Sequence, residues 1–235
     1  MAKQEKALIV GAGRGLSAAL ARLFAAEGMQ VALAARNIDK LAALAAETGA
    51  KAYACDAADP AAVGALFESV TADGGAPNLV VYNASNRGSR GPVTELAPEA
   101  VRNALLITAF GGFLVAQAAA QRMIPAGGGT ILLTGASASV KGYPNSSSFA
   151  MGKFALRGLA QSLARELQPK NIHVGHFVID GGIALRDGTD ERTAASGIDG
   201  TLNPDAIAQT YLQFHRQHRS AWAWEIELRP WVEKF

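Results

Sequence analysis

The sequence predicts a doubly wound α/β fold, in which a seven-stranded, mostly parallel sheet is flanked by helices on both faces. Short apolar runs alternate with stretches of helical periodicity along the 235 residues, and this alternation is typical of βαβ units with right-handed crossovers. No repeat, low-complexity tract or interdomain linker interrupts the pattern. We therefore expect residues 1–235 to form a single domain, and a hydrophobic content of 49% is enough to fill its core.

Seven apolar runs are expected to form the strands. Most of these runs are apolar on both faces, which is typical of strands that helices cover on both sides. The fourth run, for example, reads NLVVYNAS and ends in small polar residues. The expected strands lie within residues 6–13, 30–37, 51–56, 78–85, 129–137, 171–182 and 221–231.

Helical periodicity and end signals separate these runs. The first helical stretch, RGLSAALARLFAAEG, repeats leucine at helical spacing before a glycine that stops it. Asn37 is a plausible cap for the second helix, and Asp59–Pro60 and Asn203–Pro204 combine a cap with a first-turn proline. The expected helices span residues 14–28, 37–49, 60–70, about 98–124 and 146–167, and a sixth begins near Pro204.

Composition and charge exclude several classes of function. The 22 Lys and Arg residues against 20 Asp and Glu include no dense basic run, so we expect no nucleic-acid partner. The scattered histidines and the single cysteine, Cys55, show no metal-ligand spacing, so no metal site is expected. One cysteine cannot form an intrachain disulfide, and the N-terminal sequence MAKQEKALIVGAG lacks a signal-peptide core. These features favour a cytoplasmic protein.

The most apolar stretch, residues 104–120, is expected to be a buried helix rather than a membrane span. It contains a threonine, a glutamine and a glycine pair, and it is shorter than the usual spanning length. Because the stretch is apolar on every face, we expect one side to meet the sheet and the other to meet a second subunit.

A glycine-rich loop, GAGRGLS, follows the first expected strand. A strand that turns sharply into a helix needs glycine where a Cβ atom would clash, and the start of that helix offers free N–H groups to a pyrophosphate. The loop has glycine at 11, 13 and 15. Its Gly-x-x-x-Gly spacing, with Ser17 where a third glycine might stand, differs from the usual dinucleotide fingerprint. A tight turn without a ligand is the alternative interpretation.

The end of the second expected strand predicts which cofactor is preferred. An NAD site places a carboxylate there for the ribose hydroxyls, whereas an NADP site needs positive charge for the 2′-phosphate. Here Ala34 and Ala35 are followed by Arg36, and Arg14 lies in the glycine loop. Two guanidinium groups and no acid favour NADP(H) over NAD(H). The missing acid also argues against a methyltransferase that uses S-adenosylmethionine.

These residues resemble the short-chain dehydrogenase/reductase family, which has a Rossmann-like fold, along nearly the whole chain. GAGRGLS is similar to its Gly-x-x-x-Gly-x-Gly loop, and Asp56 stands at its adenine-contacting acid. YNAS resembles its Asn-Asn-Ala-Gly turn, FAMGK its Tyr-x-x-x-Lys motif, and IDGG its turn beside the nicotinamide. The loop, the arginines and the resemblance together predict these cofactor-binding residues: Gly11, Gly13, Arg14, Gly15, Leu16, Arg36, Asp56, Ala57, Asn83, Ala84, Ser85, Lys153, Gly181 and Ile183.

The resemblance implies a catalytic set of Asn, Ser, Tyr and Lys, of which only Lys153 is present. Thr108 stands at the Asn position, Ala136 at the Ser position and Phe149 at the Tyr position. A one-residue shift in the alignment would put Ser137 at the Ser position instead. Because neither Ala136 nor Phe149 can donate a proton to a developing alkoxide, ordinary ketone reduction should be slow.

Three residues are candidates to replace the missing acid. Tyr143 precedes the helix at 146–167 and offers a phenol, although a structural or rim position is an alternative. Ser137 offers a hydroxyl, whereas the serines at 146–148 are expected to be helix caps. Asp180 follows the sixth strand, where ligands bind in open α/β sheets. Its carboxyl could act as an acid if it is buried beside the nicotinamide, or it could cap backbone N–H groups.

Two functions are consistent with this pattern. The first is an atypical NADP(H)-dependent oxidoreductase that transfers hydride to a small organic substrate, such as an imine or a conjugated alkene rather than a simple ketone. The alternative is a catalytically silent NADP(H)-binding protein, a sensor or scaffold. In either case we expect a homodimer or homotetramer, assembled through the helices at 98–124 and 146–167, through the C-terminal strand, or through both.

Overall fold

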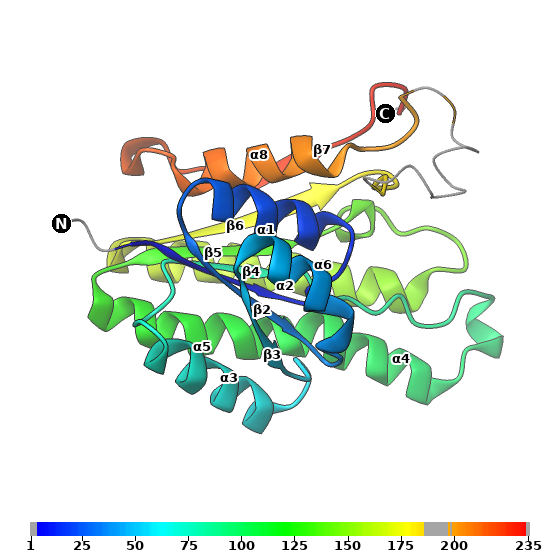
Figure 1. Cartoon of the computed structure of the whole chain (residues 1–235). Coiled ribbons are helices and arrows are strands. Elements are labelled where there is room, and N and C mark those ends of the chain that lie inside the picture. The colour runs from blue at the N-terminus through cyan, green and yellow to red at the C-terminus, as the bar shows by residue number, and fades with distance from the viewer. Residues whose placement is uncertain (1–3, 186–196, 198, 234–235) are drawn as a thin grey trace.

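The sheet is wholly parallel and has seven strands, in the order β3-β2-β1-β4-β5-β6-β7 (Figure 1). The computed structural model describes residues 4–185, 197 and 199–233. The strands are β1 Lys6–Val10, β2 Gln30–Ala35, β3 Lys51–Ala54, β4 Leu79–Tyr82, β5 Gly129–Thr134, β6 Ile172–Ile179 and β7 Glu225–Leu228. All seven expected strands are therefore confirmed, and each is shorter than the run that predicted it.

Helices cover both faces of the sheet (Figure 1). One layer consists of α1 Leu16–Ala26, α2 Ala42–Thr48 and α8 Pro204–His215. The other consists of α3 Pro60–Ala72, α4 Pro98–Leu105, α5 Gly111–Ala126 and α6 Ser147–Leu167. A separate apolar core fills the space between the sheet and each layer. The doubly wound α/β class is confirmed.

The strand order reverses at β1, which pairs with β2 on one side and with β4 on the other. The chain leaves β1 toward one helical layer and leaves β4 toward the other, so the loops after these two strands separate. A crevice therefore opens at the carboxyl ends of β1 and β4, where ligands bind in folds of this class.

The helix expected at 98–124 is a longer and interrupted element. α4 passes through a π-helical segment, Leu106–Phe110, into α5, which continues to Ala126 with Pro125 in its last turn. Single π-helical turns inside α-helices occur frequently at functional sites. Periodicity cannot reveal such a segment, because one extra residue in a turn barely changes an already apolar pattern.

Residues 98–126 have the length and apolar composition of a membrane span, and half of the most apolar window is buried inside the protein. A Cβ atom at Gly111 would lie 2.5 Å from the Tyr82 hydroxyl, and one at Gly112 would lie 2.5 Å from a Leu156 methyl group. The glycine pair thus lets α5 pack directly on β4 and α6. This packing confirms that one side of the stretch meets the sheet.

The other side of the long helix carries exposed apolar side chains. Phe110 and Phe113 stack on each other with ring centroids 6.2 Å apart, and both are about 40% exposed. Met151 and Phe154 of α6 are also exposed. These four side chains lie on the two helices that were predicted to contact a second subunit.

One local expectation needs correction. The Asn37 side chain accepts a hydrogen bond from the Asp39 backbone N–H, and this cap opens a 3₁₀ turn, Asp39–Leu41, rather than α2 itself. Most of the polar segment between β6 and α8, at 186–196 and 198, lies outside the described residues. The Asp59 and Asn203 caps are confirmed, since each side chain accepts from a backbone N–H in the first turn of its helix.

Candidate active site

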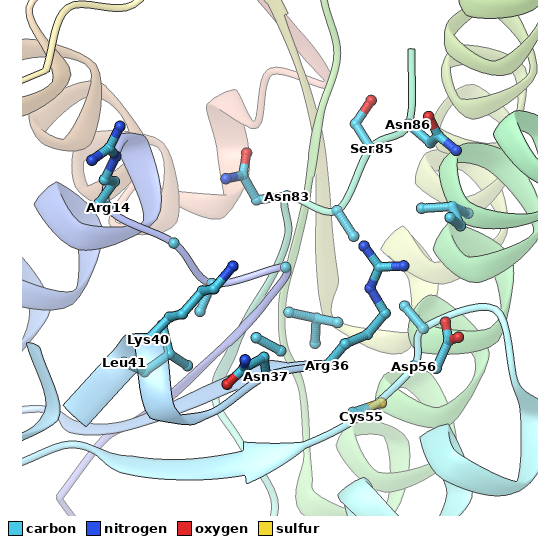
Figure 2. Close-up of a pocket in the computed structure, with 18 residues that line it drawn as sticks. Arg14, Arg36, Asn37, Lys40, Leu41, Cys55, Asp56, Asn83, Ser85 and Asn86 are labelled. Carbon is cyan, nitrogen blue, oxygen red and sulfur yellow. The ribbon is translucent and has the colours of Figure 1, made fainter. Parts of the chain in front are cut away.

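A cleft of about 650 Å³ opens at the carboxyl ends of β1, β2 and β4. Figure 2 shows its wall, with Arg14 on the glycine loop and Arg36 and Lys40 on the segment after β2. Asp56, from the loop after β3, lies at the right of the view. The lining residues are Val10, Gly11, Ala12, Gly13, Arg14, Ala35, Arg36, Asn37, Lys40, Leu41, Cys55, Asp56, Ala57, Asn83, Ala84, Ser85, Asn86 and Ile107.

Hydrogen bonds join the glycine loop to the loop after β4. Gly11 has φ +85°, and a Cβ atom there would lie 2.3 Å from the backbone N of Ala84. Only glycine fits, because the conformation and the close approach both exclude a side chain. Ser17 Oγ donates to the Gly11 carbonyl at 3.1 Å, and Asn83 Nδ2 donates to Ser17 Oγ at 2.7 Å. Ser17, at the position where a third glycine might stand, therefore links the two loops.

The loop leaves room for a pyrophosphate. A Cβ atom added at Gly13 or Gly15 would meet nothing within 4 Å. Gly15 is the N-cap of α1, and no side chain caps the helix start, so its first N–H groups remain available. Open space beside free N–H donors and a positive helix end suits a dinucleotide phosphate.

Three cationic side chains surround this space. Arg14, Arg36 and Lys40 are exposed and form no ion pair with any residue that the structure describes. Asp56 is the one carboxylate of the lining, and its Oδ1 accepts a hydrogen bond from the Ala58 N–H at 3.0 Å. The positive charge of the lining is thus largely uncompensated, as binding of an additional phosphate group requires.

Sequence reasoning missed Lys40 and placed Cys55 only as a core residue. The signal for Lys40 was its position four residues after Arg36. The chain turns at Asp39–Leu41, and both cations line the cleft. Cys55 is buried at the floor of the cleft, and burial raises the pKa of its thiol to about 11. The thiol is therefore protonated and unreactive at neutral pH.

Several predicted cofactor residues lie outside the lining of this cleft, namely Gly15, Leu16, Lys153, Gly181 and Ile183. Leu16 is buried in the core between α1 and the sheet. Gly181 approaches the C-terminal segment, since a Cβ atom there would lie 2.6 Å from the Pro230 ring. Ile183 forms a parallel bridge with Leu202. Gly181 and Ile183 thus lie in the segment after β6 rather than in the cleft beside β1.

Lys153 is the buried cation of the expected reaction site. Its Nζ donates to the Thr134 carbonyl at 2.7 Å, and the residue is 3% exposed. Burial, followed by the charge of Arg87, lowers the pKa of Lys153 to about 7. An ammonium has three N–H donors, so two remain for a ligand.

Two basic side chains lie near the Phe149 ring. The Arg87 guanidinium is 5.5 Å from the ring centroid, and Lys153 Nζ is 5.8 Å from it. Both distances suit cation–π contact. The ring therefore occupies the place of a phenol beside Lys153 without offering a proton.

Thr108 is buried within the π-helical segment and has a structural use. Its Oγ1 accepts from the Asn86 N–H at 3.1 Å and donates to the Asn86 carbonyl at 3.2 Å. Both hydrogen-bonding roles of the hydroxyl are thus satisfied by one loop residue. The side chain at the family's Asn position holds the loop after β4.

The other candidates for an acid have separate surroundings. Ala136 precedes a 3₁₀ turn, Ser137–Ser139, in which the Ser139 hydroxyl accepts from the Ala136 N–H at 3.1 Å. Ser137 is half-buried, and its hydroxyl has no hydrogen-bond partner among the described residues. Tyr143 is 44% exposed, which fits a position at the rim.

Asp180 is buried at the end of β6, as expected, but its partner was not foreseen. Its carboxylate accepts from Lys141 Nζ at 3.0 Å, and no backbone N–H among the described residues is capped by it. The hydrogen bond to this carboxylate raises the pKa of Lys141. Asp180 is thus paired with an ammonium, a contact that neither of its two predicted roles included.

The serines at the start of α6 are not side-chain caps, contrary to expectation. Ser146 is the N-cap residue but makes no capping hydrogen bond. Ser148 is buried, and its hydroxyl faces the carbonyls of Arg87 and Ser89 at 3.0 and 3.3 Å. Ser148 therefore anchors the loop after β4 to α6.

Comparisons with known proteins agree with this fold and site. The family model for short chain dehydrogenases matches residues 5–190. D-threitol dehydrogenase of Mycolicibacterium smegmatis is 32% identical over 173 residues, covering 72% of this chain and 66% of its own length. The human 3-oxoacyl-[acyl-carrier-protein] reductase is 31% identical over 168 residues, covering 71% and 70%. The chain belongs to the short-chain dehydrogenase/reductase family, whose members are oxidoreductases.

Solved structures of the family superimpose over nearly the whole chain. A short-chain dehydrogenase from Rhodopseudomonas palustris has a TM-score of 0.83 at 33% identity and covers 97% of this chain and 99% of its own. A metagenomic short-chain oxidoreductase in complex with NADP has a TM-score of 0.83 at 26% identity, with coverage of 98% and 99%. An NAD⁺-bound xylitol dehydrogenase has a TM-score of 0.85 at 25% identity, with coverage of 97% and 98%. Similar structures thus bind either cofactor, so the preference has to be argued from the residues of this cleft.

Proposed function

We propose that this protein is an NADP(H)-dependent oxidoreductase that transfers hydride to a substrate needing little acid catalysis. The observation that carries the proposal is the group of three cations, Arg14, Arg36 and Lys40, which have no ion-pair partner among the described residues and line a cleft with one carboxylate. The glycine loop and the start of α1 would hold the pyrophosphate, and the cations would hold the 2′-phosphate. Lys153 would bind the nicotinamide ribose.

The chemistry follows from the residues near Phe149. NADPH, when bound, supplies a hydride to an electrophilic carbon of the substrate. A ketone would then need a proton on oxygen, and neither Phe149 nor Ala136 has one to give. An iminium ion becomes a neutral amine without a proton, and a conjugated alkene moves the electron pair away from the carbon that is attacked. These two substrate classes suit the site better than a simple ketone.

The proton that a conjugated alkene finally requires goes to carbon after hydride transfer, so water can supply it without an acid placed at a developing alkoxide. In the family the lysine lies beside a tyrosine, whereas here Lys153 Nζ lies 5.8 Å from the centroid of the Phe149 ring.

Cofactor binding tests the proposal directly. We expect isothermal titration calorimetry to show NADPH binding at least tenfold more tightly than NADH, since each charge-assisted contact to the 2′-phosphate contributes about 1 kcal/mol or more. Arg14→Gln with Arg36→Gln should remove this preference and leave NADH affinity nearly unchanged. Arg102→Gln is the matched control, because Arg102 is an exposed arginine on α4 paired only with Glu99. Equal affinities in the unmodified protein would refute the NADP(H) assignment.

Turnover tests the substrate class. The protein with NADPH should reduce iminium or conjugated-alkene substrates faster than simple aldehydes and ketones. Ala136→Ser combined with Phe149→Tyr should raise carbonyl reduction by about 10²-fold or more, the usual contribution of a general acid. Family-typical ketone reduction by the unmodified protein would contradict the proposal, and no gain in the double variant would show that the pocket has been rebuilt.

A catalytically silent NADP(H)-binding protein is the second candidate. The observation that favours it is the reuse of Thr108, whose hydroxyl is fully engaged by Asn86. Tight NADPH binding without turnover on carbonyl, imine and enoyl panels would support this alternative.

We also propose that two copies associate through α5 and α6. The exposed side chains of Phe110, Phe113, Met151 and Phe154 form an apolar face that a second copy would cover. Sedimentation should show a dimer or tetramer, and Phe113→Glu should give monomers. A cytoplasmic location fits the single buried cysteine.

A further inference from the structure

We infer that Arg87 is a substrate-binding residue, and that it takes a carboxylate on the substrate. This inference rests on the proposed function and names the charge of the substrate. The Arg87 guanidinium lies 5.5 Å from the centroid of the Phe149 ring, on a loop whose first residues line the cofactor cleft. A guanidinium is permanently charged and presents a planar fork of donors that matches a carboxylate.

The loop that carries Arg87 is held from two sides. Thr108 binds the Asn86 N–H and carbonyl, and Ser148 binds the Arg87 and Ser89 carbonyls. Asn86 Oδ1 also accepts a hydrogen bond from the Gly88 N–H. These hydrogen bonds hold the backbone that carries Arg87, so less backbone entropy is lost when a ligand binds there.

Nothing in the described part of the chain neutralises Arg87. Arg87 is exposed, and its guanidinium forms no ion pair or hydrogen bond with a described residue; it lies over the Phe149 ring. The buried carboxylate at the end of β6, Asp180, is already paired with Lys141. The charge of Arg87 also acts on Lys153, whose pKa it helps to lower. Two basic side chains therefore lie near the Phe149 ring without a matching anion among the described residues.

This surplus charge separates the two proposed substrate classes. An iminium ion is a cation and would be repelled by Arg87. A conjugated alkene attached to a carboxylate is an anion, and it gains further negative charge when hydride adds to its far carbon. Arg87 would attract such a substrate and stabilise that developing charge, so the site favours unsaturated carboxylic acids.

Binding of paired probes tests Arg87 without requiring turnover. We would titrate trans-cinnamate and its neutral isostere, trans-cinnamamide, into the protein by calorimetry, with and without saturating NADP⁺. Cinnamate should bind about tenfold more tightly than the amide, as one charge-assisted contact predicts. Arg87→Met should lower cinnamate affinity about tenfold and leave the amide unchanged, whereas Arg87→Lys should lose only part of the preference.

Arg90→Met is the matched control, because Arg90 is an exposed arginine on the same loop. It should keep the preference for cinnamate. Equal binding of the two probes, or an equal loss in both arginine variants, would overturn the inference. Preserved discrimination without turnover of any unsaturated acid would reject the proposed oxidoreductase activity and leave the Arg87 site standing.

Discussion

Replacing Lys153 with methionine should abolish a pH dependence of stability that this buried amine creates. In the folded protein Lys153 loses its proton near pH 7, whereas its ordinary value is 10.5. Between these two values the unfolded chain binds more protons than the folded protein, so the free energy of unfolding rises with pH. Below about pH 7 the folded protein must bury a charged ammonium and carries the full penalty.

The magnitude follows from the two pKa values. Integrating the difference in proton binding from pH 6 to pH 9 gives a gain of roughly 2 to 3 kcal/mol in the free energy of unfolding. Lys153 is fully buried, so solvent screening does not reduce this figure substantially. Methionine has a similar length and no charge, so the variant lacks the gain.

Urea unfolding at pH 6, 7, 8 and 9, without added cofactor, measures the effect in both proteins. Two nearby groups titrate outside this range, since burial lowers the pKa of His176 to about 4 and raises the pKa of Tyr211. Lys170→Met serves as the control, because Lys170 is an exposed lysine just after α6. Parallel stability curves for the unmodified protein and the Lys153 variant would refute the reasoning.

Two further predictions concern the loops that border the site. Gly11→Ala should destabilise the protein by about 2 kcal/mol or more in urea unfolding, because its Cβ would lie 2.3 Å from the Ala84 backbone at a positive φ. Gly13→Ala should change stability by less than about 0.5 kcal/mol but weaken NADPH binding, and equal destabilisation by both would contradict the assignment of the open space to the cofactor. Ser148→Ala should cost about 1 to 2 kcal/mol and reduce the cinnamate preference that Arg87 provides, since its hydroxyl anchors the loop. An unchanged preference in calorimetry would show that the loop holds its position without Ser148.

Local patterns in the sequence were sufficient to predict the fold class and, within the cleft, the glycine loop and Arg36. The glycine loop, the strand before it and Arg36 lie within one βαβ unit, so their relation depends on contacts between near neighbours in the chain. The Asp59 and Asn203 caps were predicted for the same reason, because each acts on the first turn of its own helix. The π-helical segment was not predicted. It lies next to Gly111, which packs closely on Tyr82, and one extra residue in a helical turn does not alter the apolar periodicity.

Only the tertiary structure decided the chemistry beside Lys153. The sequence by itself predicted that Lys153 shares a helix face with Phe149, which stands at the tyrosine position that the family resemblance implies. It could not show that Arg87 lies over the same ring, because Ser148 joins that loop to α6 across 61 residues of chain. Burial likewise sets the pKa of Lys153, and burial depends on the whole surrounding fold rather than on neighbouring residues. Charge and contact between distant segments follow from strand order and helix packing, and these arise only when the sheet is assembled.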